Sequence, residues 1–406
     1  MEEYHGLDTK LLERFLKKRF HDEKPTEVIS VEVKNAVPKG QNYASLIYSV
    51  KMTCLTAAGK KKSFSMIVKS ELTADGVKAT MKELSVFQSE TRVFTTILPM
   101  MEELMEEFND KREKLWADLL GFQPYNKLVF EDLSDNGYIV ADRRKGLDFN
   151  HSKLVLRNLA RMHAMSKVLL ARGLITAEDR GQFLMAKEDP FIDKFWDITI
   201  TMMADAMEHK WGDEWKEMSS KLRKQLGSVG SKMRSIAENV DQRFVVFNHG
   251  DVWTCNFMFR YMEYEDSFPI SIKFIDYQGC HVNSFIWDVV QFLFSSSIPS
   301  VRRLRLTDLL ETYHKALEKN LNIFNYAGYV PTLEDVKSEW KRVEYLHFCL
   351  ASAQPITVAE TSTAFDIEKV TTHLPHEVVD ETVFTDGRAL NDVGEDYKTL
   401  AAHGVI

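Results

Sequence analysis

The spacing of apolar residues changes once along the chain, and this change constrains the possible folds more than any other feature. Up to about residue 131, alternating and β-branched segments predict antiparallel strands over 28–33, 45–56, 63–68 and 127–131. From residue 150 onward, apolar residues recur mainly at helical intervals, with strand-like runs at 244–247, 256–260 and 270–275. We therefore expect an α+β fold with two lobes: a sheet lobe over residues 1–132 and a larger, mainly helical lobe over residues 133–406.

Two helical regions belong to the predicted sheet lobe. Apolar residues recur at helical spacing over 11–20, directly after Asp8, which is a suitable N-cap. A second helical pattern runs over 81–108 and contains Pro99, and a proline inside a helix breaks or kinks it. We expect one packing helix near the N-terminus and two helices after the third strand.

Composition excludes several classes of protein. Of the 406 residues, 44% are apolar and 28% are charged, which is ordinary for a globular chain and too apolar for a disordered one. The formal net charge is −8 and the basic residues are scattered, so nucleic acid is not an expected partner. The four cysteines lie far apart without zinc-type spacing, which favours a reducing compartment.

The sequence gives no signal for secretion or membrane insertion. The first residues are acidic and polar and lack the apolar stretch of a secretory signal. Nowhere do 18 apolar residues run together, and the most apolar stretch, 285–294, is interrupted by Asp288 and Gln291. We expect a cytoplasmic, monomeric protein.

The segment 249–256, His-Gly-Asp-Val-Trp-Thr-Cys-Asn, lies between two predicted strands and carries the sharpest chemical signal. Asp251 and Asn256 have the side chains that phosphoryl transfer requires: a carboxylate that accepts a hydroxyl proton and a carboxamide oxygen that helps to bind Mg²⁺. The same residues could form an Asx-rich turn that caps backbone amides. The segment alone does not decide between the two.

Three further charged residues favour the first interpretation through their order in the chain. Asp276 ends the predicted strand 270–275, where either a second Mg²⁺-binding carboxylate or the start of a turn would fit. Lys69 ends an apolar strand, and a lysine there must find an anionic partner or stay in water. Glu90 follows on a predicted helix, and a strand lysine paired with a helix glutamate positions nucleotide phosphates in kinases.

A turn with a single glycine separates the first two strands. Gly40 begins the sequence Gly-Gln-Asn-Tyr-Ala-Ser, which lies where a phosphate-covering loop would be. With one glycine the segment is typical of an ordinary turn. Its N–H groups, with Asn42 and Ser45, could still approach the β- and γ-phosphates of a nucleotide.

Taken in order, these segments resemble the ecdysteroid kinase-like family. The resemblance covers about residues 30–350, and its most specific parts are the 249–256 loop and the segment Leu-Val-Phe-Glu-Asp-Leu at 128–133. The family belongs to the choline kinase and aminoglycoside phosphotransferase branch of the protein-kinase-like fold. The resemblance implies a bilobal fold of this type, with ATP- and Mg²⁺-dependent transfer of a phosphoryl group to a small-molecule alcohol.

The resemblance also implies roles for individual residues. Asp251 would be the catalytic base, and Asn256 and Asp276 would hold Mg²⁺. Lys69 would bind nucleotide phosphates and be oriented by Glu90.

Other matched residues would support this site. Glu131 and Leu133 delimit the hinge segment that would present backbone groups to the adenine edge. His163 matches a family histidine, and we expect it to hydrogen-bond to the catalytic loop rather than to transfer protons. Asp288 recurs in this fold and is expected to brace the same loop without being catalytic.

Departures from protein kinases favour a small acceptor. Gly250 replaces an arginine that receives an activation-loop phosphate in many protein kinases, and Trp253 stands where Ser/Thr kinases have lysine. No Asp-Phe-Gly or Ala-Pro-Glu sequence occurs. Family resemblance favours an ecdysteroid or a similar lipophilic alcohol. The aromatic and Met residues between 191 and 215 could line an apolar pocket, although at helical spacing such residues usually form core.

Two alternatives stay open. The first is a choline- or aminoglycoside-type kinase with a polar acceptor, for which Asp193, Asp197 and Asp205 could provide acids beside aromatic rings. The second is a non-catalytic relative that binds a ligand or partner through the same fold.

The tail after Gln354 is more polar than the rest of the chain, and we assign no chemistry to it. His373 and His376 are expected to lie on a solvated surface segment rather than to bind a metal.

Overall fold

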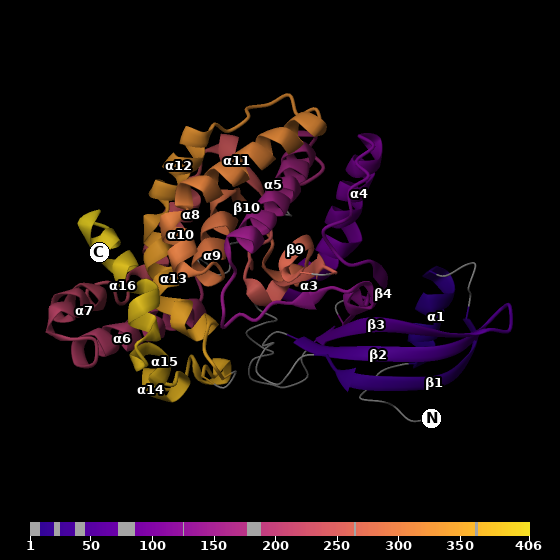
Figure 1. The fold of residues 1–406 in the computed structure, drawn as a ribbon, viewed down its shortest axis with the longest axis horizontal. Coiled ribbons are helices and arrows are strands. Elements are labelled where there is room, and N and C mark those ends of the chain that lie inside the picture. Colours follow the sequence, from indigo (N-terminus) through magenta and orange to yellow (C-terminus); the bar gives the residue numbers. More distant parts are fainter. Residues whose placement is uncertain are drawn as a thin grey trace.

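The computed structural model of the chain describes residues 9–19, 25–36, 45–71, 86–124, 126–176, 188–263, 265–361 and 364–406. Within these ranges, a lobe built on a β-sheet lies beside a larger lobe of helices and short strands (Figure 1). The predicted α+β fold is confirmed. Asn42 lies outside the described residues.

The first lobe is built on an antiparallel sheet of five strands in the order β1-β2-β3-β5-β4. Its strands are β1 (Pro25–Asn35), β2 (Ser45–Thr56), β3 (Lys61–Glu71), β4 (Leu119–Gln123) and β5 (Lys127–Glu131). The four predicted strands are confirmed, and β1 and β3 extend beyond their predicted ends. The pattern does not predict β4, because its sequence Leu-Leu-Gly-Phe-Gln does not alternate.

Helix α1 (Thr9–Arg19) packs on one face of this sheet. Leu12 and Leu16 are buried there among apolar side chains of β2, β3, β4 and β5. On β4, a Cβ at Gly121 would lie 2.3 Å from the ring of Phe15, so the glycine lets the helix approach the strand closely. Leu12 and Leu16 of the predicted apolar stripe therefore belong to the core of the first lobe.

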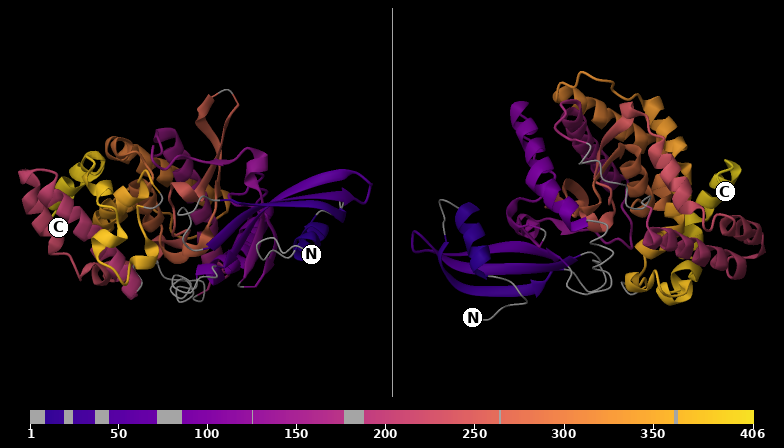
Figure 2. Two further views of the ribbon diagram at one scale, coloured as in Figure 1. Left: turned by 90° about the horizontal axis from the view of Figure 1, so that it is seen from below. Right: turned by 180° about the vertical axis from the view of Figure 1, so that it is seen from behind.

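The helical region after β3 is continuous over residues 86–107. It consists of α3 (Val86–Arg92), a π-helical turn (Val93–Ile97) and α4 (Leu98–Glu107). Pro99 lies in the first turn of α4, and the junction that the sequence predicts as a break is a change of hydrogen-bond register. Figures 1 and 2 show α4 beside α5 (Phe149–Ala171) of the second lobe, in agreement with the contacts between the two helices.

The second lobe contains two small antiparallel sheets that carry its loops. One pairs β7 (Val245–Asn248) with β10 (His281–Ser284). The other has the order β6-β8-β9, with β6 (Ile139–Val140), β8 (Phe257–Met262) and β9 (Glu265–Phe274). The three predicted strand-like runs correspond to β7, β8 and β9.

Helices make up the rest of this lobe: α5 (Phe149–Ala171), α6 (Pro190–His209), α7 (Lys216–Arg223), α8 (Val229–Glu238), α9 (Ile286–Ser295), α10 (Pro299–Leu304), α11 (Leu306–Ile323), α12 (Leu333–Arg342), α13 (Glu344–Thr357), α14 (Pro375–Val378), α15 (Thr382–Thr385) and α16 (Arg388–Ala402). Gly227, with a φ of 71°, lies between α7 and α8, and Val343 separates α12 from α13. Within the described ranges, none of the helices has the length and apolar character that crossing a bilayer requires.

The tail after Gln354 is more ordered than its polar sequence indicates. Helix α16 packs against α13, and Tyr397 is fully buried, with its hydroxyl 2.8 Å from Ser352 Oγ. His373 and His376 are exposed, as expected. Apolar residues at helical spacing, rather than overall composition, decide the burial of this segment.

A stack of aromatic rings in the second lobe ends on a buried guanidinium. The ring of Phe294 lies 3.9 Å from the guanidinium of Arg302 and 4.9 Å from the ring of His347. The ring of Trp340 lies 4.4 Å from the ring of the same histidine and 6.1 Å from that of Phe294. Burial, together with the positive charge of Arg302, lowers the pKa of His347 to about 3, so the folded protein holds this imidazole neutral.

We predict that His347→Phe makes stability less sensitive to acid. Below pH 6.5 His347 is protonated in the unfolded chain but stays neutral in the folded protein. The free energy of unfolding therefore decreases as the pH falls from about 6.5 to the folded pKa near 3. Between pH 7 and pH 5 this single group accounts for about 2 kcal/mol. Urea unfolding at both pH values should show that the phenylalanine variant loses about 2 kcal/mol less than the wild type. An equal loss in the two proteins would contradict this account.

Candidate active site

The alternation of β3 separates its core residues from Lys69. Met66 and Val68 face α1, whereas Ile67 and Lys69 lie on the opposite face of the sheet, toward the second lobe. Lys69 is 4% exposed, and its Nζ lies 2.6 Å from Glu90 Oε2 and 2.7 Å from Asp276 Oδ1. The lysine, the helix glutamate and the carboxylate at the end of β9 are therefore brought together.

The charges in this cluster do not balance. Burial alone would lower the pKa of Lys69, but Asp276 and Glu90 raise it above its ordinary value. Burial raises the pKa of Glu90 to about 7; the Lys69 ammonium opposes this rise and the negative charge of Asp276 adds to it. One ammonium faces more carboxylates than it can neutralise, which is the electrostatic setting for an added cation.

Asp276 is presented by an unusual backbone conformation. Its φ of 65° and ψ of 66° lie in the left-handed region, which aspartate tolerates better than most residues. The 3₁₀ turn Tyr277–Gly279 follows directly, and the N–H of Ile275 donates to the carbonyl of Asn256 at 3.0 Å. This hydrogen bond fixes the end of β9 to the loop that contains Asp251.

Asp251 and Asn256 face each other within that loop. The Asn256 Nδ2 donates to the carbonyl of Asp251 at 2.9 Å and to its Oδ2 at 2.8 Å, across the 3₁₀ turn Thr254–Asn256. This orientation turns the carboxamide oxygen of Asn256 away from Asp251. Burial raises the pKa of Asp251 to about 7, and the negative charge of Asp276 adds to the rise.

A buried carboxylate on α9 binds the backbone at the start of the 249–256 loop. Asp288 accepts hydrogen bonds from the backbone N–H groups of His249 (2.7 Å) and Gly250 (2.9 Å). His163 Nε2 lies 3.0 Å from the same carboxylate, and its Nδ1 lies 2.8 Å from the hydroxyl of Tyr313. His163 thus reaches the loop through Asp288. The interactions with His163 lower the pKa of Asp288 despite its complete burial, which keeps it an acceptor.

His249 joins the two halves of the site, a role that the sequence does not reveal. Its Nε2 donates to the carbonyl of Ile275 at 3.1 Å, and its Nδ1 accepts from the N–H of Asp251 at 3.3 Å. Burial lowers the pKa of this imidazole, so it stays neutral and keeps both bonds. Its ring also lies 4.6 Å from the ring of Tyr277, beside the 3₁₀ turn.

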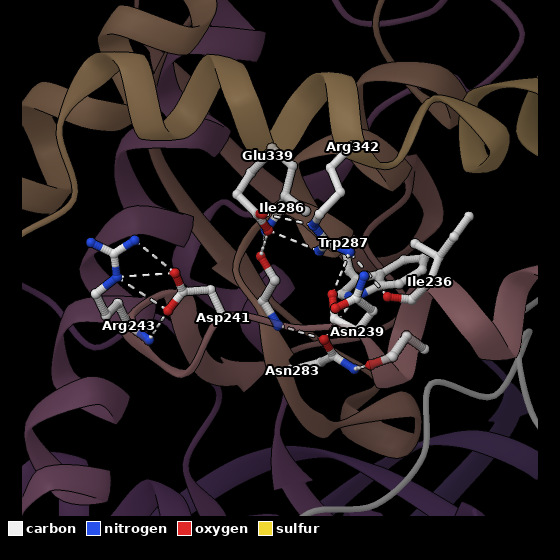
Figure 3. A network of polar contacts seen from close by, with 11 residues as sticks. Ile236, Asn239, Asp241, Arg243, Asn283, Ile286, Trp287, Glu339 and Arg342 are labelled. Carbon is white, nitrogen blue, oxygen red and sulfur yellow. Dashed lines mark hydrogen bonds and ion pairs between the residues drawn. The ribbon is translucent and has the colours of Figure 1, made fainter. Parts of the chain in front are cut away.

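A second polar network anchors the strand that pairs with β7 (Figure 3). Asn283 Oδ1 accepts from the N–H of Ser284 and from the indole of Trp287, at 2.7 and 2.9 Å. Ser284 Oγ donates to Glu339 of α12 at 2.6 Å, and Arg342 joins this carboxylate to carbonyls at the end of α8. Because β7 leads directly into the 249–256 loop, this network holds the base of that loop.

At the hinge, the side chains of Glu131 and Asp132 are engaged within the protein. The Glu131 carboxylate accepts from the N–H of Asp118 at 2.9 Å, and Leu133 is buried. Asp132 caps the 3₁₀ turn Leu133–Asn136 through Ser134. Ser45 is the first residue of β2, paired with Glu71 at the end of the sheet that carries Lys69.

The acids proposed for a cationic acceptor are engaged elsewhere. On α6, Asp205 pairs with Arg223 at 2.5 Å, and Asp197 accepts from the N–H of Gly227 at 3.0 Å. Asp193 lies 3.5 Å from Arg234. Several aromatic residues of the region are core or contact the tail, including Trp196, Phe195 and Trp211.

The arrangement of charged residues at this site is typical of one class of protein. A buried strand lysine paired with a helix glutamate, facing an Asp/Asn loop and a further aspartate, is the arrangement of kinase-like phosphotransferases. The profile of the ecdysteroid kinase-like family matches residues 39–326, and the chain belongs to that family. The protein is therefore a kinase-like relative of small-molecule phosphotransferases with a bilobal fold. A search among curated protein sequences gives no match.

We predict that the loop tolerates no side chain at Gly250. Its φ is 76°, and an added Cβ would lie 1.9 Å from the carbonyl oxygen of Gly279. Gly59 has a φ of 73° but no atom within 4 Å of an added Cβ, so its replacement measures the cost of a positive φ without a steric clash. We expect Gly59→Ala to destabilise the protein by about 1 kcal/mol and Gly250→Ala by about 3 kcal/mol or more in urea unfolding. Equal effects would show that the close approach is unimportant.

Proposed function

We propose that the protein transfers the γ-phosphoryl group of ATP to a hydroxyl of a small molecule, an ecdysteroid or a similar lipophilic alcohol. The observation that carries this proposal is the contact between Lys69 and Asp276, which are 207 positions apart in the chain. Glu90 pairs with the same ammonium, Asp251 and Asn256 contact each other, and the charge of Asp276 acts on Asp251, which supports a site for phosphoryl transfer. Family membership supports the same reaction class.

The residues of the site fit a Mg²⁺ ion. Among the described residues, no three His, Cys, Asp or Glu side chains are grouped to hold a metal unaided. Mg²⁺ usually takes one or two protein carboxylates and completes its shell with phosphates and water. Asp276 and Asn256 would hold it, and the excess of carboxylates around Lys69 supports an added cation. When bound, the ion would neutralise charge on the phosphates.

The protein's own groups would then act on the two substrates. Lys69, held by Glu90, would bind the α- and β-phosphates and fix the nucleotide for in-line transfer. Asp251 would accept the proton of the acceptor hydroxyl. At the same time the hydroxyl oxygen of the acceptor would form a bond to the γ-phosphorus, and the bond between that phosphorus and the β–γ bridging oxygen would break. ADP and a phosphate monoester leave, and no covalent enzyme intermediate is needed.

The engaged carboxylates of α6 bear on the choice of acceptor. A choline-like cation would need acids beside aromatic rings, but Asp197 and Asp205 are occupied by Gly227 and Arg223. This supports a lipophilic acceptor over a cationic one. The close grouping of Lys69 with its carboxylates supports catalysis over a binding-only role.

Replacing Asp251 tests the proposed function. We expect Asp251→Ala to lower kcat by about 10³-fold, because the acceptor hydroxyl loses its proton acceptor. ATP affinity should stay close to that of the wild type, since Lys69 and Glu90 remain. ADP release would be measured with ecdysone, choline and kanamycin as acceptors, and Asp213→Ala, which removes an exposed carboxylate, is the control.

The outcomes separate the alternatives. The proposal is supported if the wild type and Asp213→Ala turn over ecdysone and Asp251→Ala does not. Turnover with choline or kanamycin alone would move the acceptor to the polar class. ATP binding without ADP formation with any acceptor would contradict catalysis.

A further inference from the structure

The loop after β6 runs alongside the catalytic loop. Strand β6 pairs antiparallel with β8, with Ile139 opposite Phe259 and Val140 opposite Met258. It also contacts the 3₁₀ turn Thr254–Asn256. Arg143 lies in the turn that follows β6, and the chain then runs to the end of α9, where Leu147 pairs with Ser297. Ser295 Oγ at the same end of α9 donates to the carbonyl of Val252 in the catalytic loop at 3.3 Å.

The electrostatics of the Cys255 thiol agree with this placement. Burial raises the pKa of Cys255 to about 12; the positive charge of Arg143 opposes the rise, and the negative charge of Asp251 adds to it. Arg143 and Asp251 therefore both lie close enough to Cys255 to act on it.

Unlike the guanidinium of Arg144, that of Arg143 has no carboxylate partner within the described ranges. One of its N–H groups donates to the carbonyl of Thr357 at 2.6 Å. Arg144, the next residue, pairs with Asp142 at 2.8 Å and with Glu360 at 3.5 Å. Because a guanidinium carries five donors in a rigid fork, Arg143 keeps donors for another group besides the one bonded to Thr357.

The tail after Gln354 contacts the loop after β6. Thr357 is the last residue of α13, and Arg388 of α16 donates to the carbonyls of Val358 (3.2 Å) and Arg144. Arg144 and Arg388 thus already attach the tail to the loop after β6. The segment to which the sequence assigns no chemistry therefore borders the loop after β6.

We propose that Arg143 is a specificity-determining residue of the acceptor site, where its guanidinium donates hydrogen bonds to an oxygen-bearing group next to the hydroxyl that faces Asp251. This inference rests on the proposed function. It narrows the acceptor to a neutral or anionic alcohol with a second oxygen substituent near the reacting hydroxyl. A cationic acceptor such as choline would be repelled by an unneutralised guanidinium.

Kinetics of three variants test this inference, with ecdysone and choline as the acceptors. We expect Arg143→Ala to raise the KM for ecdysone at least about 10-fold, because hydrogen bonds from a charged donor are lost. The KM for ATP should change less than about 2-fold, since Lys69 binds the nucleotide in the other lobe. The ratio of kcat/KM for ecdysone to that for choline should fall. Arg144→Ala, which removes the neighbouring guanidinium, should leave these values unchanged.

Arg143→Lys separates recognition from a purely structural role. A lysine could still donate to the Thr357 carbonyl but lacks the fork, so recognition predicts that the raised KM for ecdysone persists. If Arg143 only anchored the tail, lysine would restore the wild-type KM, and that result would overturn the inference. An unchanged KM in Arg143→Ala, with an active wild type, would overturn it as well. A wild type that forms no ADP with either acceptor would instead contradict the proposed function, and this inference with it.

Discussion

The buried ammonium of Lys69 is the interaction on which the site depends. It comes from a sheet strand of the first lobe, and its two partners come from α3 and from the end of β9 in the second lobe. An ammonium removed from water without partners would be strongly destabilising, so both carboxylates must be in place when the lobes meet. The excess of negative charge that remains gives the site its electrostatic character and underlies the proposed binding of Mg²⁺ and nucleotide.

The loop that faces this ion pair is held by backbone hydrogen bonds rather than by apolar packing alone. Asp288 accepts the N–H groups of two successive loop residues, and His249 bonds the loop to the end of β9. The network around Asn283 then fixes the paired strand β10 from the far side (Figure 3). Preorganised polar groups of this kind can stabilise charge without rearranging during a reaction. On the proposed mechanism, they keep Asp251 and Asn256 in register with Asp276.

The sequence predicts the parts of this account that depend on local pattern. Alternation predicts β2 and β5 at their observed bounds, and strand ends indicate Lys69 and Asp276 as candidates. The sequence does not predict β4, whose residues do not alternate, or the π-helical turn before Pro99, in which Phe94 packs against Tyr277 of the second lobe. The sequence also does not reveal the contact between Arg143 and the carbonyl of Thr357, because the two residues lie more than 200 positions apart. Contacts between distant segments leave no local signal in a single sequence.

The most direct test of the central claim is a crystal structure with Mg²⁺ and a non-hydrolysable ATP analogue. The account predicts a single site between the lobes, with the ion bound by the carboxamide oxygen of Asn256 and the carboxylate of Asp276. Lys69 should contact the α- and β-phosphates while keeping Glu90 as its partner, and Asp251 should face the γ-phosphate. A nucleotide bound elsewhere, or an ion held by other side chains, would contradict the account.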